Sequence, residues 1–178
     1  TISARIAAAL VTRDDQPLTL RLLRRHDVSL PVDVLGQLAL TGGGAAQMRG
    51  ALLARPDLPA AARLVLVRRA TESLRQCRIV KGALAPERLE RLLRDGNDNA
   101  VSTIGETTGS NADYVDQLVS TDQLNTRLLL HAVVSGRVMF FSACLASLAQ
   151  VTADKVFGLL ESGSHASLAA LFSRCGLD

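Results

Sequence analysis

The sequence has no tryptophan and very few other aromatic side chains. Aromatic residues make up 3% of the 178 residues, although the hydrophobic share is 48%. The core must therefore consist of leucine, valine and alanine, which suit helices packed on helices, whereas sheets favour aromatic and β-branched residues. The scarcity of aromatic rings also argues against proteins that stack nucleic-acid bases on aromatic platforms. A chain of this length can bury a continuous core without disulfides or metal.

Cysteine is also rare. Cys77, Cys144 and Cys175 are odd in number and have no metal-ligand spacing. We predict reduced, mostly buried thiols in a cytoplasmic protein, with no metal and no cofactor.

One hydrophobic run, Leu128–Val151, is long enough to raise the question of a membrane span. His131 and Arg137 interrupt it, and Ser135-Gly136 is a pair that ends helices. Two buried helices of about twelve residues explain the run better than a transmembrane helix. We therefore expect no membrane contact, and a core that includes Phe140, Leu145 and Leu148.

A convincing period-two strand is absent, and apolar residues instead recur at three- and four-residue steps. The pattern predicts helices over 2–12, 17–26, 31–41, 45–54, 59–80, 86–94, 98–107, 111–120, 123–134, 137–149, 152–161 and 165–174. Ser110 with Asp113, and Ser120 with Gln123, have the spacing of capping boxes at two helix starts. The sequence therefore predicts an all-α protein.

Helix boundaries recur along the chain. Leu52-Leu53 with Asp57 repeats Leu22-Leu23 with Asp27 thirty residues earlier, and Leu58-Pro59 repeats Leu30-Pro31. Leu92-Leu93 with Asp95, and Leu159-Leu160, resemble degenerate copies. In each copy we expect two leucines to close one helix, an aspartate or asparagine to cap the next helix, and proline to occupy its first turn. A drifting period of roughly 30 to 40 residues is typical of stacked helix pairs.

Charge is distributed unevenly. Residues 63–94 carry nine basic and three acidic side chains, whereas residues 95–178 carry four basic and nine acidic ones. In the helix expected from Pro59, Leu64, Val67, Ala70, Leu74 and Cys77 share an apolar face, and Arg63 lies away from it. Arg68, Arg69, Arg75 and Arg78 are the candidate partner-binding residues, because guanidinium groups recognise carboxylates and phosphates. A solvated outer face is the simpler alternative.

Two stretches imitate ligand-binding motifs. In Asp95–Glu106, acidic and amide residues occupy positions 1, 3, 5 and 12 of a calcium-binding EF-hand loop. Ala100 stands where that loop needs glycine, so we predict a polar turn between helices, with Asn97 or Asp98 as N-cap. The glycines after Thr41 lack the Gly-Lys-Ser/Thr of a phosphate loop, and we expect them to end a helix in left-handed conformations.

Candidate catalytic residues do not form a set. His26, His131 and His165 are isolated in sequence, and Ser164 beside His165 lacks the Gly-x-Ser-x-Gly elbow of hydrolases. No nucleophile, base and orienting residue can be assembled, so we do not expect an enzyme.

Two long stretches carry a family resemblance. "GALLARPDLPAAARLVLVRRATESLR" and the C-terminal "LNTRLLLHAVVSGRVMFFSACLASLAQVTADKVFGLLESGSHASLAALFSRCGL" resemble the bacterial family called domain of unknown function 2336. The resemblance covers about Leu22 to Leu177 and is most specific in the last fifty residues. It implies HEAT-like helical repeats and carries no activity, cofactor or catalytic residue.

Together these features predict a right-handed stack of helix pairs, a HEAT-like α-solenoid of about 10 to 12 helices. We expect one domain over residues 1–178, with a repeat-like part to about residue 121 and a closing part over about 122–178. The predicted function is a non-catalytic scaffold for protein–protein interaction, with an acidic protein or a second copy as partner. The alternative is a nucleic-acid-binding repeat protein that uses the basic region 63–94.

Overall fold

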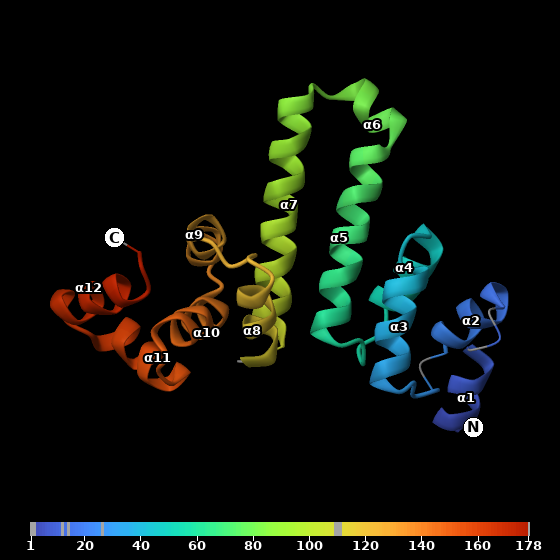
Figure 1. Cartoon of the computed structure of the whole chain (residues 1–178), viewed down its shortest axis with the longest axis horizontal. Coiled ribbons are helices and arrows are strands. Elements are labelled where there is room, and N and C mark those ends of the chain that lie inside the picture. Colours follow the sequence, from blue (N-terminus) through green and yellow to red (C-terminus); the bar gives the residue numbers. More distant parts are fainter. Residues whose placement is uncertain (1–2, 12, 14, 26, 109–111, 178) are drawn as a thin grey trace. The chain divides into compact units, whose positions relative to one another are not determined.

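The computed structural model describes residues 3–11, 13, 15–25, 27–108 and 112–177, and within them it contains helices and no strand. The all-α prediction is confirmed (Figure 1). The helices are α1 (Ala4–Val11), α2 (Gln16–Leu23), α3 (Val32–Gly42), α4 (Ala46–Leu53), α5 (Ala60–Gln76), α6 (Arg78–Ala83), α7 (Pro86–Thr107), α8 (Ala112–Ser120), α9 (Thr126–Val134), α10 (Val138–Ala149), α11 (Ala153–Ser162) and α12 (His165–Arg174).

Two predicted boundaries were wrong. The helix expected over 59–80 breaks at Cys77, whose backbone is extended, and continues as the short α6. The helices expected over 86–94 and 98–107 form one continuous helix, α7. The buried residues Leu89, Leu93, Val101 and Ile104 lie on one face of this helix, on both sides of the polar residues 95–99. Burial of that face stabilises the helix through the polar residues. Leu92-Leu93 is therefore not a helix boundary.

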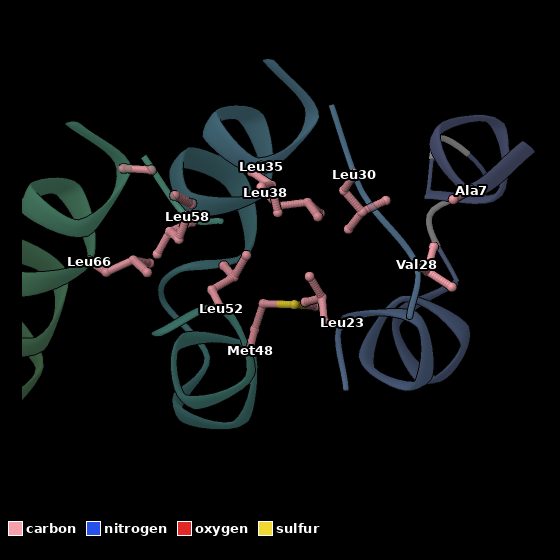
Figure 2. Packing of buried hydrophobic residues seen from close by; sticks show 12 residues of the cluster. Ala7, Leu23, Val28, Leu30, Leu35, Leu38, Met48, Leu52, Leu58 and Leu66 are labelled. Atoms are coloured by element: carbon pink, nitrogen blue, oxygen red, sulfur yellow. The ribbon is translucent and has the colours of Figure 1, made fainter. Parts of the chain in front are cut away.

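The chain divides into two compact units, Thr1–Asn97 and Asp98–Asp178. In the first unit α1 packs on α2 and α3 packs on α4. Successive pairs are also in contact, because α2 lies against α4 and α3 lies against α5. Figure 2 shows the core between them, in which Leu23 and Met48 lie near Leu52, while Leu35 and Leu38 come from α3. Small aliphatic side chains fill this core, as the composition predicted.

The boundary between α4 and α5 contains a buried arginine. The Arg55 side chain is 2% exposed, and its guanidinium donates to the carbonyl oxygens of Leu23 at 3.3 Å, Arg25 at 3.2 Å and Val28 at 2.8 Å. It also donates to both carboxylate oxygens of Asp57, at 2.8 and 2.6 Å. Carbonyls after a helix end have no partner within the helix, and the five N–H groups of one guanidinium can satisfy several of them. Arg55 therefore fastens the α4–α5 boundary to the α2–α3 boundary.

Arg63 lies in the first turn of α5. It binds three backbone carbonyl oxygens that lie thirty residues further along the chain than the three bound by Arg55. Its guanidinium donates to the carbonyl oxygens of Leu58 at 3.2 Å, Leu53 at 3.4 Å and Arg55 at 2.7 Å. These hydrogen bonds hold the half-buried Arg63 side chain against the turn.

The predicted caps of α3 and α5 were wrong. Asp57 accepts from Arg55 instead of capping α5, and Asp27 accepts from Arg25 Nε at 3.0 Å instead of capping α3. Pro31 and Pro59 are themselves the N-cap residues, one position before the predicted first turn. A nearby guanidinium offers each carboxylate a charge-assisted pair, which is stronger than a hydrogen bond to a neutral backbone N–H.

The second unit is organised around α10, which contacts α8, α9, α11 and α12. Phe140, Cys144 and Leu145 of this helix are fully buried or nearly so, as predicted for Phe140 and Leu145, whereas Leu148 is half-buried. Gly105 of α7 allows the Phe140 ring to lie close, since a Cβ at Gly105 would stand 2.0 Å from Phe140 Cδ2. The helix α7 thus needs a glycine at this contact.

Polar groups complete the contact between α7 and α10. The Glu106 carboxylate accepts a hydrogen bond from the Phe140 backbone N–H at 2.8 Å, in the first turn of α10. The Tyr114 hydroxyl donates to the Val101 carbonyl at 3.0 Å, and its ring centroid lies 6.3 Å from that of Phe140.

The expected break in the hydrophobic run is confirmed. The helix α9 ends before Ser135, and Gly136 adopts a φ of 71°, a left-handed conformation that glycine tolerates. The predicted capping box at Ser120 and Gln123 was wrong: Ser120 ends α8, and α9 is capped by Asn125, whose side chain accepts from the Leu128 N–H at 3.0 Å. Ser110, of the other predicted capping box, lies outside the described residues.

Candidate functional site

The helix α5 buries only its first half, and the candidate arginines come after it. Ala60, Ala62, Leu64 and Leu66 are buried against the first unit, whereas Leu74 is 48% exposed. Figure 1 shows the C-terminal half of α5 extending past α3 and α4. The predicted apolar face therefore holds for Leu64 but ends before Leu74, because α3 and α4 do not reach the later turns.

A shallow groove of about 490 Å³ brings three of the four candidate arginines together. It is lined by Leu40, Val65, Arg68, Arg69, Thr71, Glu72, Arg75 and Asn97. Arg78 is not among them, because the break at Cys77 places it in α6. Leu40 is 50% exposed. The groove therefore combines an exposed apolar side chain with several guanidinium groups.

Arg68 and Arg69 are the exposed arginines of this groove. Arg69 Nη2 donates to the Leu40 carbonyl at 3.2 Å, near the C-terminal end of α3, where helix carbonyls carry partial negative charge. This hydrogen bond places the Arg69 guanidinium beside the exposed Leu40 side chain.

Arg75 has a structural role, which the sequence did not reveal. Its guanidinium contacts Glu90 of α7 at 2.9 Å and Glu72 at 2.7 Å. Hydrogen bonds to Glu90 and then Glu72 raise the pKa of Arg75, and Arg75 holds the pKa of the Glu90 carboxyl below its ordinary value. Hydrogen bonds from Gln76 and then Arg75 lower the pKa of Glu72. Arg75 thus links α5 to α7, and two carboxylates neutralise its charge.

The structure adds residues that the sequence analysis missed. Leu40 is contributed by α3, and no local pattern connects it to α5. Arg55 was missed because its charge suggested exposure, although the Arg-x-Asp pattern at Arg25 and Asp27 recurs at Arg55 and Asp57. That recurrence was the available signal for a structural arginine.

The stretch that imitates an EF-hand is helical. Residues 95–106 lie inside α7, so the predicted polar turn is wrong. Asp98, one of the two expected N-caps, instead pairs with Arg127 of α9 at 3.0 Å. Within the described part of the chain, no three His, Cys, Asp or Glu side chains gather where they could hold a metal ion.

The remaining candidate residues lie in ordinary helical positions. The glycine run after Thr41 ends α3, as predicted, but Gly43 is right-handed, with a φ of −62°. His131 Nε2 lies 3.3 Å from Ser135 Oγ one turn later, and Ser164 caps α12 by accepting from the Ser167 N–H at 3.2 Å. His165 begins α12, and His26 lies outside the described residues.

In the described residues, no helix by itself has both the length and the apolar character needed to cross a membrane. The helices α10 and α11 meet that criterion only as a pair bent by 116°.

The comparisons with known proteins place the chain in a family. The model of the family described as "Uncharacterised protein conserved in bacteria (DUF2336)" matches residues 1–178. The chain belongs to this family, which confirms the resemblance seen in the sequence. Neither the search of curated proteins nor the search of solved structures found a match.

Proposed function

We propose that this chain is a non-catalytic helical-repeat scaffold for protein–protein interaction, and that an acidic segment of a cytoplasmic protein partner binds the groove at Arg68 and Arg69. The observation that carries the proposal is the groove itself, which places exposed guanidinium groups beside the exposed Leu40. Arginine forks bind carboxylates in a bidentate manner, and an apolar contact beside them adds area that excludes water.

The proposed architecture is a right-handed HEAT-like α-solenoid in one domain, with a repeat-like part to about residue 121 and a closing part over about 122–178. Contacts of α2 with α4 and of α3 with α5 support the stacking of successive pairs. The two carbonyl sets bound by Arg55 and Arg63 support a repeat of thirty residues. Repeat proteins of this kind present extended outer surfaces to partners.

Affinity capture tests the proposal. The chain is immobilised and exposed to a nuclease-treated lysate of the source organism, in parallel with the R68E/R69E variant. A matched control, R21E/R24E, reverses two exposed charges on and after α2. We expect a protein that is retained by the wild type and the control and lost by R68E/R69E, and whose purified form binds less tightly as salt rises. Equal retention of that protein by all three chains would exclude the groove as its binding site.

Nucleic-acid binding is the second candidate function. Arg88, Arg91 and Arg94 are exposed at three-residue steps on α7, which gives the basic region 63–94 a stripe of cations. Duplex DNA titrated against the wild type and R88E/R91E tests it by fluorescence anisotropy. Micromolar binding that strengthens at low salt and is lost in the variant would favour this function.

A further inference from the structure

The short helix α6 joins α5 to α7 and has no buried residue. In Figure 1 it lies at the end of the α5–α7 hairpin, and among the other helices of its unit it packs on α5. Ile79, the second residue of α6, is 83% exposed. An isoleucine side chain left in water forgoes the hydrophobic stabilisation that burial would give it. The helix therefore presents an apolar side chain without a partner from its own unit.

The same short helix carries two cations. Arg78 and Lys81 are both exposed, and Lys81 Nζ lies 3.5 Å from the neutral Gln76 side chain. The nearby carboxylates of Glu72 and Glu90 are bound by Arg75. Among the described residues neither Arg78 nor Lys81 forms a salt bridge, although the charge of Lys81 helps to lower the pKa of the Glu72 carboxyl from a longer distance. We call Arg78, Ile79 and Lys81 the α6 tip.

A surface of opposite charge occurs on α11. Asp154, Phe157 and Glu161 stand at positions i, i+3 and i+7, so they share one face of this helix. All three are exposed, and the Phe157 ring is 38% exposed. This α11 face has the composition of the α6 tip with the charges reversed, because each contains one large apolar side chain and two like charges.

We propose that the α6 tip of one copy of this chain binds the α11 face of a second copy, with Ile79 packed against Phe157 and the cations beside Asp154 and Glu161. The charge distribution of the whole chain agrees with this pairing, because the basic excess lies in residues 63–94 and the acidic excess in residues 95–178. Opposite charges steer the encounter, and the apolar pair supplies the desolvated centre of the contact.

The pairing uses two different surfaces, so the contact is heterologous, and it either closes or extends to further copies. It goes beyond the proposed scaffold function and does not depend on it, because Arg68, Arg69 and Leu40 take no part. A failure of self-association would leave the groove proposal standing, and a failure of the groove would leave this one standing.

Sedimentation velocity of the purified chain over a range of micromolar concentrations tests the pairing. We expect association that grows with concentration and weakens with added salt. R78E/K81E and D154K/E161K should each weaken it by at least about tenfold, because like charges then face each other. Ile79→Ser should weaken it without changing the net charge. The matched controls R21E/R24E and R68E/R69E should associate as the wild type does.

Mixing the two charge-reversed variants provides the sharpest test. In the mixture the reversed tip of one variant faces the reversed α11 face of the other, and the original charges meet in the second contact. Association should therefore return to near the wild-type level, and circular dichroism should show the same helix content for every variant. A wild type that stays monomeric, variants that associate as the wild type does, or a mixture that fails to recover would each overturn the proposal.

Discussion

Arg55 and Arg63 bind equivalent sets of backbone carbonyl oxygens that lie thirty residues apart in the chain. Arg55 reaches back to the set at Leu23, Arg25 and Val28, from the next helix boundary along. Arg63 fills the set at Leu53, Arg55 and Leu58 from the first turn of α5. Arg55 connects two successive helix pairs, whereas Arg63 binds carbonyl oxygens of the turn directly before its own helix.

Replacing Arg55 should destabilise the fold strongly. Arg55→Ala leaves the carbonyls of Leu23, Arg25 and Val28 without their donor, so we expect a loss of about 3 kcal/mol in the free energy of unfolding. Urea denaturation measures it. Arg25→Ala is the matched control, because the Arg25–Asp27 pair is about half exposed, and it should cost clearly less because water screens an exposed ion pair. Equal costs would show that the buried hydrogen bonds contribute little.

Arg63→Gln should have an intermediate effect. A glutamine amide is shorter and has two donors, so it cannot reach all three carbonyls, but these are part-buried or exposed and water can replace some donors. We expect a loss of about 1 kcal/mol in urea denaturation. A loss in the free energy of unfolding equal to that of Arg55→Ala would contradict the distinction between Arg55, which connects two helix pairs, and Arg63, which binds a neighbouring turn.

The pair of Arg55 with Asp57 should give stability a dependence on acidic pH. The hydrogen bond from Arg55 lowers the pKa of the Asp57 carboxyl. A group whose folded pKa is lowered stabilises the fold above its unfolded pKa, which is about 3.9 for aspartate, and this contribution disappears as the pH falls through the folded pKa. Asp57→Asn should therefore flatten the stability curve below about pH 4, as followed by thermal unfolding. Asp27→Asn, at the exposed pair, should flatten it less.

Gly105→Ala should destabilise the second unit although alanine favours helix. The new Cβ would meet the Phe140 ring at 2.0 Å. We expect a loss of about 1–3 kcal/mol from the forced shift. Gly96→Ala, in the same helix, adds a Cβ with nothing within 4 Å and should stabilise by up to about 1 kcal/mol. If both substitutions stabilise, the close approach of Phe140 to α7 is wrong.

The three cysteines should react with thiol reagents at different rates. Burial raises the pKa of the Cys144 thiol to about 12, and it raises the pKa of Cys175 as well. Because the thiolate is the reactive form, Cys144 should stay unmodified near neutral pH until the chain unfolds. Mass spectrometry after timed labelling would locate the modified residues. Rapid modification of Cys144 in the folded chain would show that α10 is not packed as described.

The sequence by itself determined the helices and most of their limits. Apolar spacing identified α3, α10 and α12 within one residue, and Ser135-Gly136 marked the break in the hydrophobic run. The same spacing ran through Leu89, Leu93, Val101 and Ile104, but the polar string between them suggested a turn. The apolar spacing predicted one helix there, whereas the polar residues predicted a turn. One helix forms because its apolar face is buried.

Only the tertiary structure decided what each charged side chain does. Local sequence makes Arg55, Arg63 and Arg75 look alike, yet the fold buries Arg55, places Arg63 on carbonyls and binds Arg75 between two glutamates. Helix formation depends on neighbours within a turn or two, which the sequence displays. The partner of a guanidinium comes from residues far along the chain, such as Val28 for Arg55 and Glu90 for Arg75, and their proximity exists only after the helices have packed.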